Sequence, residues 1–97
     1  MRLELACQAL RERKCLELRY DGWARTVEVH AAGYTKEDNA IMRVWQARGG
    51  SNSGANGWKL LRLDEVVSGH ICPEHSNAPR QGYKRGDRAM ARIVCQL

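Results

Sequence analysis

No stretch of this 97-residue sequence stays apolar over the roughly 18–20 residues that a membrane-spanning helix needs. Arg2 and Glu4 interrupt the amino-terminal stretch, where a signal peptide would be apolar. We therefore expect a cytoplasmic protein that does not contact a membrane. Disorder is not expected either, because hydrophobic residues make up 43% of the sequence and charged residues 28%, as in ordinary globular proteins. The length predicts a single domain over residues 1–97.

The sequence has no Cys-x-x-Cys pair. Its four cysteines are Cys7, Cys15, Cys72 and Cys95. Without a secretory signal, the thiols are expected to stay reduced, and Cys7, Cys15 and Cys95 to be small buried side chains. Two disulfides are one alternative. A metal site is another, because Cys72 and His75 have the spacing of a ligand pair and His70 is nearby. No second pair supports that site, so we predict no metal and no cofactor, with a metal-dependent enzyme as an alternative.

The sequence also lacks the motifs of common catalytic sites. It has no nucleophile elbow, and its glycine-rich stretch at residues 48–57 does not end in the Gly-Lys-Ser/Thr of a phosphate-binding loop. Carboxylates are paired only as sequence neighbours, at residues 37–38 and 64–65. Adjacent residues on a strand point to opposite faces, so such neighbours do not easily share a proton. We therefore predict that this protein is not an enzyme.

Hydrophobic residues first follow helical spacing and then alternate. Leu3, Ala6 and Leu10 predict a short amphipathic helix within residues 1–14. Alternation then predicts five strands, at residues 15–20, 25–30, 41–47, 58–63 and 66–72. No helix separates these strands, which excludes a doubly wound α/β fold. We predict a mainly β fold with flanking helices: a small Sm-like or SH3-like antiparallel barrel of five strands over residues 15–72.

The last part of the sequence, residues 73–97, differs in composition. Residues 80–97 contain five basic residues and one acidic residue, a net charge of +4 out of +5 for the whole chain. Asp87 is the expected N-cap of a C-terminal helix. Its apolar stripe would consist of Ala89, Met90, Ile93, Val94 and Leu97. The basic residues form a predicted patch for nucleic acid or another partner: Arg80, Lys84, Arg85, Arg88 and Arg92.

Two arginines lie inside predicted strands. Arg43 shares a strand face with Trp45. Arg62 shares a strand face with Trp58. A charged side chain in such a place has to be paired, or to stand at the mouth of a pocket. If the two strands pair, the guanidinium groups lie beside aromatic rings, which suits a phosphate or carboxylate attached to a planar ring. Alternatively, each arginine stacks on tryptophan and pairs with a glutamate across the sheet, with a role in packing alone.

Four stretches carry a family resemblance. They are Leu16–Tyr20, Arg25–Tyr34, Ile41–Gln46 and, most specific, Trp58–Val66 with the sequence WKLLRLDEV. In this order they resemble the WYL domain, a small barrel best known as the sensor part of bacterial transcription regulators. The resemblance runs from the first helix to about Cys72, and residues 82–87 are similar to the tail of short members. The Trp-Tyr-Leu tripeptide is replaced by Ala-Ile-Met at residues 40–42, and Val29 replaces a proline of the family.

The resemblance implies a ligand-sensing module in transcription regulation, with a basic pocket for a nucleotide-like anion or single-stranded nucleic acid. Carried over to this chain, Arg62 and then Arg43 would hold the anion. The other candidate ligand-binding residues, from the strands and the glycine-rich loop, are His30, Tyr34, Trp45, Trp58, Ser51 and Ser53. No helix-turn-helix precedes the predicted barrel, which excludes reading of duplex DNA through that motif by this chain alone. A separate DNA-binding regulator is the expected partner.

An alternative of another class is a protein–protein interaction or homodimerisation module. In this hypothesis the basic C-terminal helix docks on a partner, and the barrel binds no small ligand. The position of the two arginines separates the hypotheses. Ligand sensing by this pair requires Arg43 and Arg62 to reach one open hollow that no acidic side chain fills.

Overall fold

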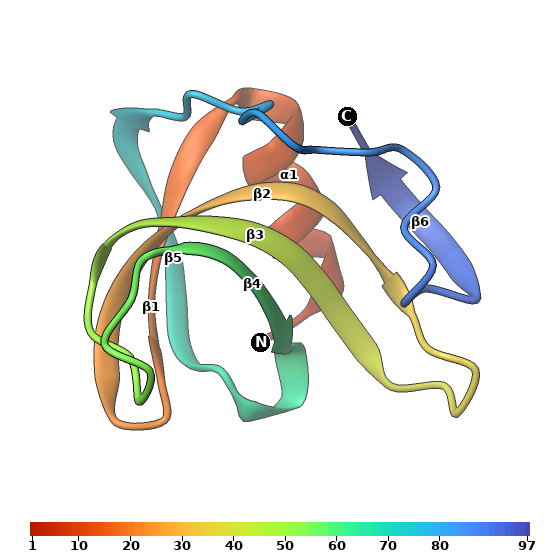
Figure 1. Ribbon diagram of the computed structural model, residues 1–97, viewed down its shortest axis with the longest axis horizontal. Coiled ribbons are helices and arrows are strands. Elements are labelled where there is room, and N and C mark those ends of the chain that lie inside the picture. The colour runs from red at the N-terminus through yellow and green to blue at the C-terminus, as the bar shows by residue number, and fades with distance from the viewer.

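A computed structural model describes all 97 residues, whose strands form one antiparallel sheet with an α-helix on one side (Figure 1). The elements are α1 (Leu3–Glu12), β1 (Lys14–Tyr20), β2 (Trp23–Tyr34), β3 (Ala40–Gly49), β4 (Gly57–Arg62), the 3-10 helix η1 (Leu63–Glu65), β5 (Val67–His75) and β6 (Arg92–Gln96). The strand order is β4-β3-β2-β1-β5, and β6 also pairs with β2. The helix and the first five strands lie where hydrophobic periodicity predicts them. Neither α1 nor η1 has the length and apolar character that crossing a membrane requires.

The long strand β2 is the centre of the sheet. Along one edge β3 pairs with it over nearly its whole length. The other edge is divided, because β1 pairs with residues 23–27 and β6 pairs with residues 31–34. The backbones of β2 and β6 approach closely at Gly33, where an added Cβ would clash with the carbonyl oxygen of Arg92. Any side chain at Gly33 would therefore displace β6.

The main core lies between α1 and the sheet. Leu3, Ala6 and Leu10 follow helical spacing on α1 and are buried. The strand residues of the same cluster include Leu16, Val27, Val29, Met42, Val44 and Leu61. Burial of each leucine- or methionine-sized side chain stabilises the fold by about 1.5–3 kcal/mol relative to exposure. This face of the sheet is therefore covered by α1.

The predicted five-stranded barrel is wrong, because the sheet has six strands and stays open. Strands β4 and β5 lie at the two ends of the strand order and do not pair with each other. The chain passes between them through η1 and Val66 rather than through a hairpin turn, so no ladder closes the sheet. Alternating apolar residues predict strands in the same way for an open and a closed sheet. Periodicity therefore did not separate the two architectures.

The predicted C-terminal helix is also wrong. Asp87 does begin a turn, in which its carboxylate accepts the backbone N–H of Ala89 at 3.0 Å. The chain then enters β6, where half-buried Ile93 and Cys95 flank exposed Val94. The free edge of β2 offers backbone hydrogen-bond partners to this segment. These tertiary contacts override the helical spacing of the apolar residues.

Residues 76–91, here called the tail, form neither helix nor strand (Figure 1). The tail covers the face of the sheet opposite α1. Met90 of the tail packs there against Ala31 and Ile41, in a small cluster separate from the main core. Their sequence neighbours Ala32 and Met42 belong to the α1 side, and successive strand residues point to opposite faces. The tail therefore forms a second layer over β2 and β3.

A buried ion pair fixes the start of the tail. The side chain of Glu28 on β2 is 1% exposed and accepts hydrogen bonds from Arg80 Nε at 2.7 Å and Nη2 at 3.1 Å. It also accepts the backbone N–H of Asn77 at 2.9 Å. Burial by itself raises the pKa of Glu28, but these hydrogen bonds and the charge of Arg80 hold the pKa below its ordinary value. Glu28 is therefore ionised and ties the tail to β2.

A disulfide fixes the strand that follows the tail. It joins Cys7 of α1 to Cys95 of β6, with the two Cα atoms 5.8 Å apart. The expectation that all thiols stay reduced is therefore wrong for these two residues. They are 88 positions apart in the sequence, so only the fold brings them together. Cys15 and Cys72 are free and buried.

Candidate anion-binding site

Aromatic side chains cover the sheet face beneath the tail. Trp45 of β3 and Trp58 of β4 are cross-strand neighbours, and their rings pack edge to face with centroids 5.4 Å apart. The ring of His30 on β2 lies 4.7 Å from that of Trp58 and 5.2 Å from that of Tyr83 in the tail. Each such pair contributes about 0.5–1.5 kcal/mol beyond its buried area. The cluster therefore holds Trp58 and Tyr83 in place as an aromatic wall.

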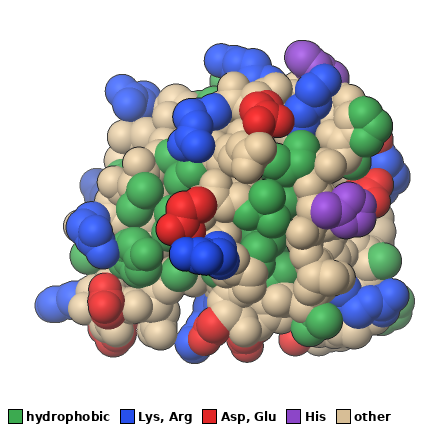
Figure 2. All heavy atoms as spheres, turned by 180° about the vertical axis from the view of Figure 1, so that it is seen from behind, with side chains coloured by type: hydrophobic (Ala, Val, Ile, Leu, Met, Phe, Trp, Pro, Cys, Tyr) green, Lys and Arg blue, Asp and Glu red, His purple; other side chains and the backbone are tan.

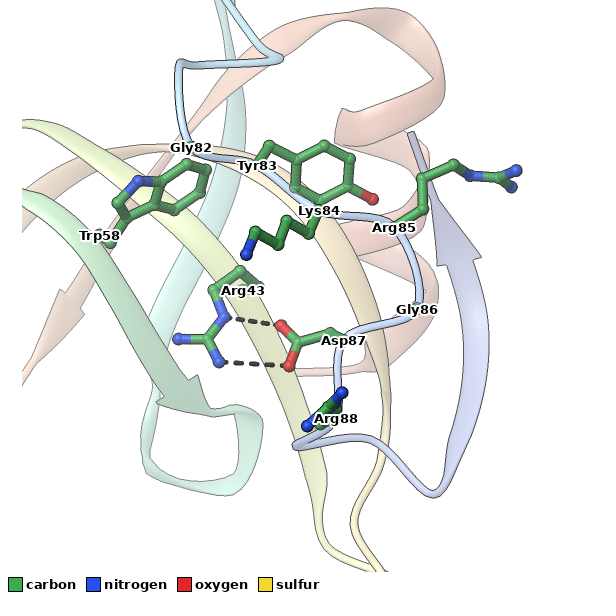
Figure 3. A pocket seen from close by; sticks show the side chains of 9 residues that line it. All are labelled: Arg43, Trp58, Gly82, Tyr83, Lys84, Arg85, Gly86, Asp87 and Arg88. Atoms are coloured by element: carbon green, nitrogen blue, oxygen red, sulfur yellow. Dashed lines mark hydrogen bonds and ion pairs between the residues drawn. The ribbon is translucent and has the colours of Figure 1, made fainter.

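This wall borders a cavity of about 750 Å³ between the sheet and the tail (Figure 3). The lining residues are Arg43, Trp58, Gly82, Tyr83, Lys84, Arg85, Gly86, Asp87 and Arg88. The volume is within the range of roughly 300–1,000 Å³ that is usual for small-molecule sites. In Figure 3 the side chain of Lys84 points back over the cavity toward Arg43, whereas that of Arg85 points away.

The charges around the cavity are unbalanced. Asp87 is the one carboxylate of the lining, and it accepts hydrogen bonds from Arg43 Nε at 2.7 Å and Nη2 at 3.2 Å. These bonds hold the pKa of Asp87 below its ordinary value, so both partners are charged. Lys84 and Arg88 are exposed and pair with no carboxylate, and Arg85 donates to a backbone carbonyl. Four cationic side chains thus line the cavity with one anionic side chain.

Arg62 lies outside this cavity. It shares the outer sheet face with Arg43, as strand alternation predicts. Its guanidinium group donates to the carboxylate of Asp64, at 2.7 Å from Nη2 and 3.1 Å from Nε, and also to Asn39. The expected hollow shared by Arg43 and Arg62 is therefore absent, and each arginine is bound to a carboxylate. A site built on these two arginines together is not present.

Three other predicted residues support the cavity without lining it. His30 is buried beneath Trp58 and Tyr83. Trp45 packs against Trp58, and the guanidinium group of Arg80 lies 5.3 Å from the centroid of the Trp45 ring. Arg80 is held by Glu28, whose side chain is 1% exposed, and it does not line the cavity. These residues position the aromatic wall.

The remaining predicted residues lie elsewhere. The guanidinium group of Arg92 stacks 4.4 Å from the ring centroid of Tyr34, outside the cavity lining. Ser51 and Ser53 are hydrogen-bonded to each other in the loop between β3 and β4. Of the predicted basic patch, Lys84, Arg85 and Arg88 line the cavity, and the other two members do not.

Four lining residues were missed as site residues: Gly82, Tyr83, Gly86, and Asp87, which the sequence predicts only as a helix cap. Tyr83 follows Gly82, where an added Cβ would lie 3.3 Å from Nε1 of Trp58. The contact is tight, and the φ of Gly82 is +95°, a backbone conformation that favours glycine. The sequence did contain a signal for Tyr83. An aromatic residue follows a glycine there, and two tryptophans lie on one face of the predicted sheet.

His30 is held in its neutral form by two hydrogen bonds. The backbone N–H of Arg80 donates to Nε2 at 2.9 Å, so Nε2 carries no proton. The proton is then on Nδ1, which donates to the carbonyl oxygen of Glu28 at 3.0 Å. Burial lowers the pKa of His30 below its ordinary value, although the hydrogen bond and charge of Glu28 oppose this shift. Protonation of Nε2 breaks the contact with the tail.

We expect the free energy of unfolding to fall by roughly 1 kcal/mol between about pH 7.5 and pH 5.5. In the unfolded chain His30 binds a proton near its ordinary pKa of 6.5, and in the folded protein only at lower pH. The unfolded state therefore takes up more protons in this window, and stability is lost as the pH falls. Glu28, whose folded pKa lies below 4.5, adds a further loss only at more acidic pH.

Urea denaturation at the two pH values measures this loss. The control is His30→Gln, which has no titrating ring and is expected to lose much less stability over the same window. The charged groups that face His30 are Glu28 and Arg80, and the phenol of Tyr83 also lies against it. Equal losses in the wild type and in His30→Gln would assign the pH dependence to other groups.

The alternative metal site is not assembled. Cys72 donates its thiol hydrogen bond to the carbonyl oxygen of Cys15, and His70 pairs with Glu17 at 3.0 Å. No group of three or more histidine, cysteine, aspartate or glutamate side chains is placed to hold a metal ion. Burial raises the pKa of the Cys15 thiol to about 12. This thiol is therefore protonated at neutral pH and is a poor nucleophile or ligand.

The opposite side of the molecule shows no similar concentration of one charge. Seen from behind, apolar side chains form a central band, and basic and acidic side chains are interspersed around it (Figure 2). The basic cavity beside the aromatic wall is therefore the strongest candidate for a functional site. Comparisons with protein-family models, curated proteins and solved structures find no match to this chain.

Proposed function

We propose that this chain is a non-enzymatic module that binds a phosphate attached to a planar base, in the cavity between the sheet and the tail. One observation carries the proposal: the cavity is lined by more cationic than anionic side chains, and these lie beside an aromatic wall. Lys84 and Arg88 have no carboxylate partner there. Trp58 and Tyr83 supply the wall.

The chemistry of each group supports a phosphate ligand. The guanidinium fork of Arg43 already binds two carboxylate oxygens, and the same fork binds two oxygens of a phosphate. Lys84 and Arg88 are exposed, so they can approach an anion without losing another partner. Stacking of a base on an aromatic side chain contributes about 1–3 kcal/mol, and Trp58 offers such a ring.

A free nucleotide and single-stranded nucleic acid both present this chemistry. The WYL resemblance adds a role in transcription regulation through a DNA-binding partner, which stays a prediction from the sequence. The alternative hypothesis requires a C-terminal helix that docks on a partner, and no such helix forms. The apolar residues assigned to that helix include Met90 and Ile93, which pack on the chain's own sheet.

We expect the double variant Lys84→Gln/Arg88→Gln to bind adenosine monophosphate about tenfold more weakly than the wild type. Neither side chain makes a hydrogen bond within the protein, so the variant should keep its melting temperature. The matched control is Arg11→Gln/Lys36→Gln, which removes the same charge from two exposed sites outside the cavity. Binding is measured by isothermal titration calorimetry at fixed salt.

Smaller probes test the contributions of the base and of the phosphate separately. Adenosine alone and inorganic phosphate alone should each bind more weakly than adenosine monophosphate, because each fills part of the site. A short single-stranded oligothymidylate tests the nucleic-acid source. If the two double variants weaken its binding equally, with a steep dependence on salt, the contact is nonspecific attraction to the backbone and the proposed site is wrong.

A further inference from the structure

Asp87 occupies the strongest anion-binding position of the cavity. Its two oxygens lie 2.7 and 3.2 Å from Nε and Nη2 of Arg43, the arrangement in which a guanidinium group also holds two phosphate oxygens. The side chain of Asp87 is 11% exposed, and that of Arg43 is 29% exposed. Figure 3 shows the pair at the edge of the cavity, with Lys84 and Arg88 on either side of it.

We propose that Asp87 is an internal competitor of the ligand, and that a phosphate monoester binds by displacing its carboxylate from Arg43. This inference rests on the proposed function and deepens it. A monoester carries a charge of about −1.5 to −2 at neutral pH, more than the carboxylate that it replaces. A phosphodiester or a carboxylate carries a single charge, so its exchange with Asp87 gains little.

The surroundings of Asp87 allow the exchange. One oxygen, Oδ1, also accepts the backbone N–H of Ala89, so the carboxylate keeps a hydrogen bond after it leaves Arg43. Lys84 and Arg88 are exposed neighbours in the same segment and have no acidic partner. A bound phosphate would therefore meet Arg43 on the sheet and these two cations from the tail.

A second arginine–aspartate pair provides a matched control. Arg62 binds Asp64 through the same atoms, Nε and Nη2, at 3.1 and 2.7 Å. This pair is exposed and lies outside the cavity. Asp64→Asn and Asp87→Asn make the same chemical change and the same change in net charge. Only Asp87→Asn frees an arginine that lines the cavity.

The experiment compares adenosine monophosphate with cyclic adenosine monophosphate, a diester with the same base. In the wild type the monoester should bind more tightly than the diester. Asp87→Asn should bind both about tenfold more tightly, because the competitor is removed, whereas Asp64→Asn should change either affinity less than twofold. The side-chain amide oxygen in Asp87→Asn can still accept the N–H of Ala89, so this variant should fold. Asp87→Ser, whose hydroxyl also accepts that N–H, is the second variant.

Failure of this inference and failure of the proposed function give different results. If wild-type binding depends on Lys84 and Arg88 but Asp87→Asn binds no more tightly, Asp87 does not compete and the cavity proposal stands. If neither the wild type nor Asp87→Asn binds the monophosphate, both are overturned. Equal wild-type affinities for the monoester and the diester overturn the preference for a monoester. A further test needs no variant. The NMR signal of the Arg43 Nε–H group is followed in the wild type, and an unchanged signal on saturation with the monophosphate would show that Asp87 is not displaced.

Discussion

Reduction of the disulfide between Cys7 and Cys95 is expected to lower the free energy of unfolding by about 3–4 kcal/mol. The bond closes a loop between residues 88 positions apart, nearly the whole chain, so breaking it releases much conformational freedom in the unfolded state. Proteins of this size have few kilocalories of stability to lose. Urea denaturation with and without reductant measures the difference.

The control for this prediction is the double variant Cys7→Ala/Cys95→Ala. Reductant should leave its unfolding curve unchanged, because Cys15 and Cys72 are free thiols in both proteins. Thiol titration in denaturant should find two reactive thiols in the oxidised wild type and four after reduction. An oxidised and a reduced protein with the same unfolding midpoint would show that the bond contributes no stability.

Removal of the Glu28 side chain is the second large change. Glu28→Ala should lower the free energy of unfolding by about 2–3 kcal/mol. The variant leaves the guanidinium group of Arg80 and the backbone N–H of Asn77 without their acceptor. The value is below that for a fully buried pair, because the side chain of Arg80 is 31% exposed and water can reach part of it.

Two variants test the cause of this loss. Glu74→Ala breaks an ion pair with Arg48 in which both side chains are about half exposed, so it should cost less stability than Glu28→Ala. Glu28→Ala/Arg80→Ala should cost less than the sum of its single changes, because no charge is then left unpaired. If Glu28→Ala costs no more than Glu74→Ala, burial adds nothing to the Glu28 pair, and the tail is held mainly by its apolar contacts.

Short-range patterns were enough to locate the helix and five of the strands. Leu3, Ala6 and Leu10 recur at helical spacing, and Leu16 and Leu18 alternate along β1, because each element presents one face to the same core. The closure of the sheet and the pairing of β6 depend on contacts between distant residues. The apolar residues of β6 also satisfy helical spacing, so the sequence pattern favours a helix, whereas pairing with the edge of β2 makes this segment a strand.

The candidate site was predictable in part for the same reason. Strand alternation places Arg43 with Trp45, and Arg62 with Trp58. The pairing of Trp45 with Trp58 across β3 and β4 then puts these side chains on one sheet face. Alternation does not reveal that Asp87, 44 positions after Arg43, binds this arginine. Asp64 is only two positions from Arg62, but η1 has to turn the chain before the two can meet. The alternation of residues along a strand does not predict ion pairs with residues that lie in a turn or in the tail.

The division of one edge of β2 between β1 and β6 has a consequence for self-association. If β6 detached, the backbone N–H and C=O groups of residues 31–34 would lack partners on that edge. The segment that fits this gap, with no side chain in its way at Gly33, is β6 itself, supplied by the same molecule or by a neighbour. Exchange of a terminal strand between two copies begins from such an opening. The bond between Cys7 and Cys95 keeps each β6 with its own chain and so blocks this route to swapped dimers.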